Sequence, residues 1–266
     1  MDIKILHFYP DLMSLYGSYA NVSVLKRRLE QMGNTVTVKP ILPGQEADLS
    51  SADFLYMGAG TEHAQKAALA DFARYGETVK AAAESGVAML FAGTAMELLG
   101  KTITDADGNV HDGIGLADFT AVQGSKRFVE DVYGHTDLYP EAVVRFMNKC
   151  STISGVETPL LAELALGYGN NGEKTPEGFH RNNVFASQLT GPLLVKNPRM
   201  LDAVVDAIYR HRGESLPAER PTDHWAEDGY LITAEQLKLR SESKQRIRNE
   251  EGLRRSPSLF ILSPSR

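Results

Sequence analysis

The chain has 266 residues, of which 42% are hydrophobic and 23% charged, a balance typical of soluble globular proteins that bury a sizeable core. Its formal net charge of −6 argues against a general nucleic-acid binder, which needs a basic face. The first residues lack the apolar segment of a signal peptide, and no apolar run reaches the roughly 18 residues that span a bilayer, so we expect a cytoplasmic protein without a membrane span.

The N-terminal part of the sequence alternates strand and helix patterns. Short runs of apolar and β-branched residues predict strands over residues 3–9, 35–41, 53–57 and 87–92. Helical periodicity between them predicts helices over residues 22–32, 62–75 and 78–85. This order predicts an α/β fold with a mostly parallel sheet and helices on both of its faces.

The stretch over residues 87–100 carries the strongest chemical signal. Its buried strand breaks at Gly93-Thr94-Ala95 and continues as the start of a helix, which is the geometry of a nucleophile elbow. The strand over 53–57 ends in a similar way, at Gly58-Ala59-Gly60. Because ligands bind beyond the carboxyl ends of parallel strands, we expect both loops to lie on one rim of the sheet. The apex of the elbow is Gly93, which has no side chain.

The patterns change beyond residue 100. A turn-rich link over 104–109 and alternation over 120–144 predict antiparallel strands, followed by short strands at 145–150, 160–166 and 183–189 and a helix ending at 211. We therefore expect a domain over residues 1–212 and an appendage over residues 213–266. The appendage reads as a linker at 217–223, a charged helix at 233–249 and disorder from 252. Basic residues along that helix fit either a solvated surface or a segment that docks on a partner.

The single cysteine, Cys150, excludes an intrachain disulfide, and the sequence contains no Cys/His spacing typical of a zinc site. We therefore expect neither a cofactor nor a metal.

A series of short motifs runs along the chain: His7-Phe8-Tyr9-Pro10-Asp11-Leu12, Tyr16-Gly17, Asn21, Gly58-Ala59-Gly60 with Gln65, Glu97-Leu98-Leu99-Gly100, Gly115-Leu116-Ala117-Asp118-Phe119, Arg127, Gly167-Tyr168-Gly169-Asn170-Asn171, and Gly191-Pro192-Leu193-Leu194 with Lys196-Asn197. Taken together, these motifs resemble class I glutamine amidotransferases of the cobyric acid synthase (CobB/CobQ) type. The nearest resemblance is to the glutaminase subunit (GatD type) of lipid II isoglutaminyl synthase, and it covers about residues 3–212.

The resemblance implies a flavodoxin-like amidotransferase fold and the hydrolysis of glutamine to glutamate and ammonia. It also implies a Mur-ligase-like partner (MurT type), which uses ATP and the ammonia to amidate the D-glutamate of the peptidoglycan stem peptide. This chemistry needs a Cys thiolate at the elbow, a His base, backbone N–H donors for the oxyanion, and a group that holds the glutamine.

The two reactive positions are both substituted in this chain. The family reads Cys-Gly-Gly-Tyr-Gln-Leu-Leu-Gly where residues 93–100 stand, so the nucleophile position is Gly93. The family reads Tyr-Leu-His-Gly-Pro where residues 188–192 stand, so the base position is Thr190. Because losing one member of such a pair already removes most of the rate, we expect a catalytically degenerate chain that stabilises or regulates the ligase.

Four residues are candidates to replace the lost pair, and each has a simpler interpretation. The Thr94 hydroxyl adjoins the elbow but has no His near it in sequence. Cys150, in what the family suggests is a loop near the pocket, is typical of a small buried residue. His180 is expected in a loop, and His63 on the surface where a helix begins. An active glutaminase with an unconventional nucleophile therefore stays an alternative.

Other parts of the family site are retained. The resemblance assigns oxyanion or carboxylate contacts to the backbone N–H groups of Gly58, Ala59, Gly60 and Thr94, although the family has three glycines where Ala59 interrupts this loop. It assigns the glutamine α-carboxylate to Arg127, whose guanidinium suits bidentate contact. A pocket that binds glutamine or another small acid without hydrolysing it is a third possibility.

Overall fold

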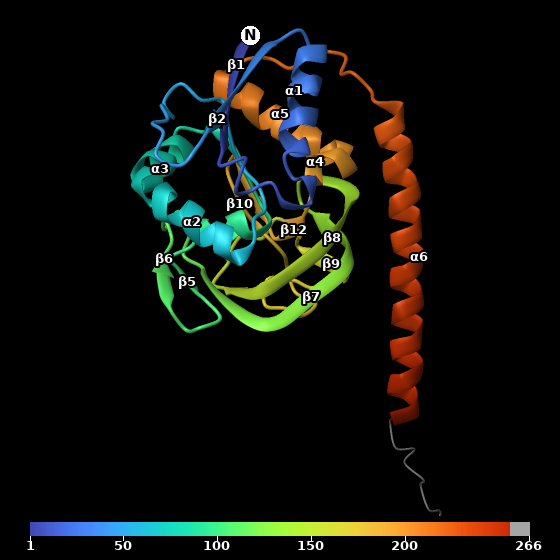
Figure 1. Ribbon diagram of the computed structural model, residues 1–266. Coiled ribbons are helices and arrows are strands. Elements are labelled where there is room, and N and C mark those ends of the chain that lie inside the picture. Colours follow the sequence, from blue (N-terminus) through green and yellow to red (C-terminus); the bar gives the residue numbers. More distant parts are fainter. Residues whose placement is uncertain (256–266) are drawn as a thin grey trace, which may run out of the picture.

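The computed structural model describes the backbone of residues 1–255 and the side chains of residues 1–247. Its strands form two six-stranded sheets (Figure 1). The first sheet has the strand order β10-β11-β4-β3-β1-β2, and all neighbouring pairs are parallel except β10 with β11. Its strands are β1 (Asp2–Phe8), β2 (Thr35–Ile41), β3 (Phe54–Met57), β4 (Ala88–Ala92), β10 (Phe179–Arg181) and β11 (Val184–Ser187).

Helices cover both faces of this sheet, which confirms the predicted α/β architecture. Alternation along β1 sends Ile3 and Ile5 into one hydrophobic cluster and Leu6 and Phe8 into the other. The first cluster includes buried residues of α1 (Ala20–Gln31), α4 (Leu193–Lys196) and α5 (Pro198–Arg212). The second includes residues of α2 (Glu62–Phe72), the 3-10 turn η2 (Ala73–Tyr75) and α3 (Gly76–Glu84).

The second sheet is mostly antiparallel and lies against the carboxyl end of the first. Its strands follow the order β12-β8-β7-β5-β6, with β9 also paired to β7. They are β5 (Thr102–Thr104), β6 (Val110–Asp112), β7 (Thr120–Thr136), β8 (Tyr139–Ser154), β9 (Glu163–Leu166) and β12 (Leu189–Thr190). The antiparallel strands expected over 120–144 are present, but the separate short strand expected at 145–150 is the middle of β8, because β7 and β8 are strands of 17 and 16 residues that form one long hairpin.

The hairpin contains an irregularity that interrupts its alternation. Gln123 pairs with Ser151 and Phe128 with Lys149, so five steps along β7 match only two along β8. Residues 124–127, which stand opposite Cys150 alone, form a bulge in β7. A bulge of this kind redirects the side chains that it contains.

The helix expected after the elbow is a 3-10 helix, η3 (Gly93–Leu99), rather than an α-helix. It ends at Gly100, where a Cβ would lie 2.6 Å from the Phe119 ring, and the chain then enters β5. A second short 3-10 turn, η1 (Leu15–Gly17), follows β1.

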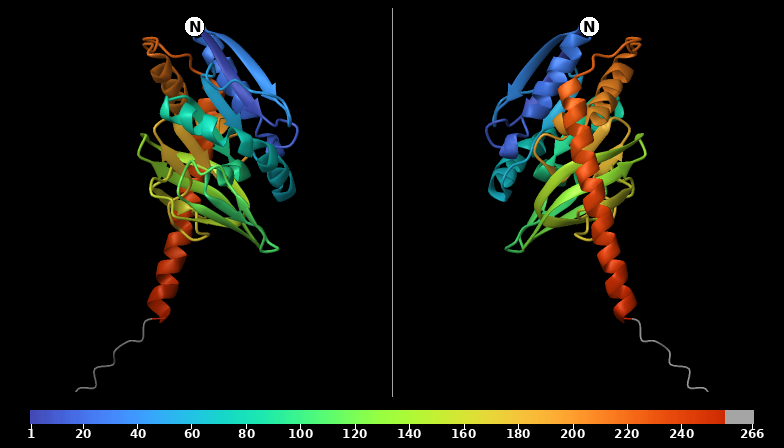
Figure 2. Two further views of the ribbon diagram at one scale, coloured as in Figure 1. Left: turned by 90° about the vertical axis from the view of Figure 1, so that its left-hand side faces the viewer. Right: turned by 90° about the vertical axis from the view of Figure 1, so that its right-hand side faces the viewer.

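The C-terminal appendage is a 32-residue helix, α6 (His224–Arg255), that extends past the body of the molecule (Figures 1 and 2). It begins nine residues before the predicted start at 233 and continues through residues 252–255, where disorder was predicted. The rest of that predicted segment, 256–266, lies outside the described residues. One face of α6 packs on the hairpin, where Tyr230 Oη donates to the Ala142 carbonyl over 2.8 Å and Arg240 pairs with Glu130 at 2.7 Å. Trp225 is 89% exposed. The domain boundary at 212 stays a prediction.

Among the described residues, none of the helices has the length and apolar character that a membrane crossing requires.

Candidate functional site

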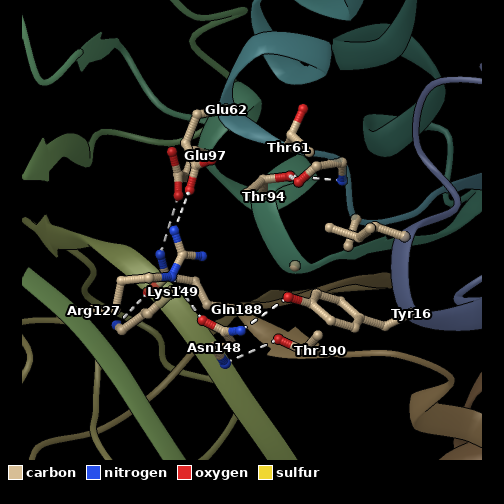
Figure 3. Close-up of a pocket in the computed structure, with 14 residues that line it drawn as sticks. Tyr16, Thr61, Glu62, Thr94, Glu97, Arg127, Asn148, Lys149, Gln188 and Thr190 are labelled. Carbon is tan, nitrogen blue, oxygen red and sulfur yellow. Dashed lines mark hydrogen bonds and ion pairs between the residues drawn. The ribbon is translucent and has the colours of Figure 1, made fainter. Parts of the chain in front are cut away.

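A pocket of about 270 Å³ lies where four parallel strands end. The segments after β1, β3, β4 and β11 form one side of it, and β7, β8 and β12 form the other. Figure 3 shows Arg127 and Asn148 on strands of the second sheet, across from Thr61 and Thr94. The lining residues are Leu15, Tyr16, Ala59, Gly60, Thr61, Glu62, Gly93, Thr94, Glu97, Arg127, Asn148, Lys149, Gln188 and Thr190.

The elbow apex, Gly93, keeps the backbone conformation of a nucleophile position. It leaves the extended end of β4 with a φ of +63°, in the left-handed region where a side chain is strained. A Cβ built on Gly93 would lie 2.5 Å from the Cβ of Ala59 and 3.2 Å from its Cα. The Ala59 methyl group therefore occupies the space that a nucleophile side chain at residue 93 would enter.

Backbone N–H groups in the loop after β3 already have hydrogen-bond partners within the protein. The Thr94 hydroxyl accepts from the Gly60 N–H over 2.9 Å and donates to the Gly60 carbonyl over 3.0 Å. The Ala59 N–H donates to Ser18 Oγ over 3.3 Å. An oxyanion that used the N–H groups of Ala59 and Gly60 would have to displace these partners, so their role as donors stays a prediction. Gly58 does not line the pocket and instead packs against Ser18.

Thr190, the predicted base position, is buried in β12, and its hydroxyl accepts a hydrogen bond. Thr190 Oγ1 accepts from the Asn148 N–H over 3.1 Å, and Asn148 Nδ2 donates to Tyr16 Oη over 2.9 Å. None of the 14 described lining residues is a Cys or a His. The pocket thus offers neither a thiolate nor an imidazole to a bound amide.

Arg127 reaches the pocket from the end of the bulge in β7. Its Nη1 lies 3.2 Å from Glu62 Oε1, and its Nε donates to Asn148 Oδ1 over 2.9 Å. The side chain is 47% exposed, so its guanidinium is accessible to a ligand in the pocket. The predicted carboxylate contact agrees with this position but is not tested by it.

A buried polar network that the sequence did not predict supports the pocket floor. Glu97 is 1% exposed, and its carboxylate accepts from Gln65 Nε2 at 2.8 Å and Gln123 Nε2 at 2.9 Å. Ser151 and Gln188 donate to its other oxygen. The signal in the sequence was limited to polar residues among apolar ones, such as Gln123 and Ser151 in strands and Gln65 in α2, and local periodicity does not connect such residues across the chain.

Lys149 is the cation of this network. Its ammonium donates to the Gly169 carbonyl over 2.6 Å, to the Asn170 carbonyl over 3.3 Å and to Gln188 Oε1. Burial lowers the pKa of Lys149 to about 8, an effect that the nearby carboxylates of Glu177 and Glu97 oppose. Because three acceptors already hold the ammonium group, Lys149 is a fixed structural charge rather than a mobile one.

Of the four candidate replacements for the catalytic pair, Thr94 lines the pocket, whereas Cys150, His180 and His63 do not. Cys150 is in strand β8, not in a loop, and its thiol donates to Glu62 Oε1 over 3.0 Å. Burial and the Glu62 carboxylate raise the pKa of Cys150 to about 12, which disfavours the nucleophilic thiolate. His180 is also in a strand, β10, with its ring 4.9 Å from that of Phe185, and His63 is exposed on α2.

Among the side chains that the structure describes, no group of three or more His, Cys, Asp and Glu residues is arranged to hold a metal ion.

Comparison with known proteins finds relatives of this chain. The chain is 30% identical over 219 residues to the GatD subunit of lipid II isoglutaminyl synthase (glutamine-hydrolyzing) from Streptococcus pneumoniae, covering 81% of this chain and 84% of the relative. It is 27% identical over 247 residues to the GatD subunit from Staphylococcus aureus, covering 92% and 98%. A glutamine amidotransferase structure from Thermotoga maritima aligns with a TM-score of 0.46 and 12% identity over 91% of this chain and 97% of that one.

Residues 4–198 match the CobB/CobQ-like glutamine amidotransferase domain. This match spans both sheets, the elbow at Gly93 and the pocket around it. The chain therefore belongs to the CobB/CobQ-like glutamine amidotransferase family.

Proposed function

We propose that this chain is a catalytically degenerate subunit of a complex like lipid II isoglutaminyl synthase, acting in the cytoplasm as the structural or regulatory partner of a Mur-ligase-like, MurT-type subunit. The observation that carries the proposal is the elbow, where Gly93 provides no nucleophile and the Ala59 methyl group occupies the space of one. Similarity to two GatD subunits supports the choice of complex.

The alternative of an unconventional nucleophile has less support. The Thr94 hydroxyl is held by both backbone groups of Gly60, and the Cys150 thiol is held protonated beside Glu62. Neither group has an imidazole among the described pocket residues to remove its proton. In this proposal the ligase obtains ammonia from solution or from another source.

A second candidate function is the binding of glutamine or a related small acid, favoured by the retained pocket and the accessible Arg127 guanidinium. Such binding is compatible with a regulatory role, because a ligand that prefers the assembled state strengthens assembly.

The test combines catalysis and assembly. Release of ammonia and glutamate from glutamine is measured for the purified chain alone and for the chain mixed with its ligase-like partner. The proposal expects background rates in both mixtures, stable co-purification of the two chains, and ligase activity that increases with added ammonium. Turnover well above background would refute degeneracy, and replacing Cys150 and Thr94 separately by Ala would then identify the nucleophile. Failure of the two chains to co-purify would refute the partner role.

A further inference from the structure

Arg145 is a charged residue on the inward face of the β7–β8 hairpin. Alternation along β8 places it in one row with Val143, Met147, Lys149 and Ser151, all of which are buried. A cation in such a row normally has acceptors or carboxylates around it, because burying an unpaired charge is unfavourable.

No such partner surrounds Arg145 among the described residues. Its Nε is buried without a hydrogen-bond partner, and no ion pair or hydrogen bond involves its guanidinium. Burial lowers its pKa, and no carboxylate opposes that shift. Lys149, four residues along the same strand, provides the contrast, because it has three acceptors and two nearby carboxylates.

The guanidinium lies next to the pocket lining, although Arg145 is not itself a lining residue. A Cβ at Gly191 would be 2.0 Å from Arg145 Nη2 and 3.1 Å from the Tyr16 carbonyl oxygen. Tyr16 lines the pocket, as does Thr190, the residue that precedes Gly191. The absence of a side chain at Gly191 leaves room for the guanidinium. Gly191 also has a φ of +80°, a backbone conformation that residues with a side chain rarely adopt.

We propose that the Arg145 guanidinium is a binding site for a carboxylate at the edge formed by Tyr16 and Gly191. The inference deepens the proposed function, since the carboxylate comes either from a small acid in the pocket or from an acidic side chain of the ligase-like partner. A second cation beside the former base position gives the pocket a preference for an acid, such as glutamate, over the neutral amide of glutamine. Arg127 contacts the carboxylate that both molecules share.

The proposal predicts that one substitution at Arg145 has opposite effects on stability and on binding. Replacing Arg145 by Met removes a partly buried charge that has no ion pair among the described residues and keeps an unbranched apolar side chain, so the isolated chain becomes more stable. The same replacement removes the partner of the carboxylate, so binding becomes weaker. A merely structural arginine would give a loss of stability instead.

The first arm is calorimetric titration of the full chain with glutamate and with glutamine, together with thermal unfolding. Wild type is expected to bind glutamate at least tenfold more tightly than glutamine, and Arg145→Met is expected to remove that preference while raising the unfolding temperature. Arg127→Met is expected to weaken both ligands alike. Arg181→Met is the matched control, because Arg181 donates only to the Leu116 carbonyl and lies outside the pocket lining.

The second arm is co-purification with the ligase-like subunit. If wild type binds neither small molecule, loss of co-purification in Arg145→Met but not in Arg181→Met assigns the carboxylate to the partner. The proposal is overturned if the Arg145→Met variant is less stable than wild type. It is also overturned if the variant changes neither the ligand preference nor the assembly with the ligase-like subunit. These results are separate from the glutaminase assay, so the inference can fail while the proposed function stands.

Discussion

Replacing Gly93 by Ala tests whether Ala59 occupies the space of the nucleophile. The substitution forces a side chain into a φ of +63°, which costs about 1–2 kcal/mol of stability for an L residue. It also places a Cβ 2.5 Å from the Ala59 Cβ, and overpacking of this kind costs about 1–3 kcal/mol more. We therefore expect Gly93→Ala to lower the free energy of unfolding by about 2–5 kcal/mol.

The chain contains a matched control for the backbone part of this cost. Gly213 ends α5 with a φ of +66°, and a Cβ placed there would meet nothing within 4 Å. Gly213→Ala should therefore show only the conformational cost of about 1–2 kcal/mol. The difference between the two variants measures the contact with Ala59.

A double-mutant cycle separates the contact directly. In an Ala59→Gly background the 2.5 Å contact is removed and only the 3.2 Å contact with the Cα of residue 59 remains, so Gly93→Ala should cost only slightly more than Gly213→Ala does. The expected coupling energy is about 1–3 kcal/mol, measured by urea denaturation with unchanged m-values. Additive effects of the two substitutions, or equal costs for Gly93→Ala and Gly213→Ala in the wild-type background, would refute the reasoning.

The same geometry makes a prediction for catalysis. Restoring the family pair with Gly93→Cys and Thr190→His should leave the chain inactive as long as the Ala59 methyl group remains. Adding Ala59→Gly should be required for any glutamine turnover, which an ammonia-release assay measures. Activity of the Cys/His variant with Ala59 in place would show that the loop moves aside.

Three further predictions concern single groups. Thr94→Val removes the acceptor of the Gly60 N–H and should cost about 1–3 kcal/mol in urea denaturation, whereas Thr94→Ser should cost much less; equal costs would contradict the hydrogen-bond argument. Because its pKa is raised to about 12, Cys150 should react slowly with iodoacetamide at pH 8, and Glu62→Gln should accelerate alkylation by removing the charge that opposes the thiolate; an unchanged rate would count against that electrostatic effect. Burial lowers the pKa of His7 to about 4, so the unfolded chain binds the proton more tightly and stability is lost as the pH falls from about 6.5 to 4. His7→Phe should remove about 3 kcal/mol of this pH dependence, and identical pH profiles of the free energy of unfolding would refute the prediction.

The sequence was sufficient for the parts of the fold that depend on local periodicity. Alternating apolar residues and glycine-rich strand ends correctly predicted the parallel sheet and brought the loops at Ala59 and Gly93 to one edge. It was not sufficient for the full extent of the hairpin: the separate strand predicted at 145–150 is the middle of β8, because local patterns indicate strand character but not the length over which two strands stay paired. The start of α6 was missed for a related reason: apolar residues lie both on its packed face, as at Tyr230, and on its exposed face, as at Trp225, so no single stripe marks the helix.

The sequence likewise predicted some parts of the candidate site and missed others. A motif comparison could predict that Gly93 and Thr190 are substituted positions, because each prediction depends on one residue at a known spacing. The network around Glu97 was missed because its donors come from α2, β7 and β8 and from the loop after β11. The contact between the Ala59 methyl group and the apex was missed because it joins residues 34 positions apart that only the closed sheet brings together.

The attachment of α6 to the hairpin has a thermodynamic consequence. Arg240 and Lys244 of α6 hold Glu130, which is three residues beyond Arg127 on β7. One strand therefore carries both the residue that faces the pocket and the residue that anchors the projecting helix. If a ligand at Arg127 alters how firmly α6 is held, linkage requires that a protein bound along α6 alter the affinity for that ligand by the same factor. A pocket without catalytic groups would then still report the state of assembly, as the input of a switch rather than the site of a reaction.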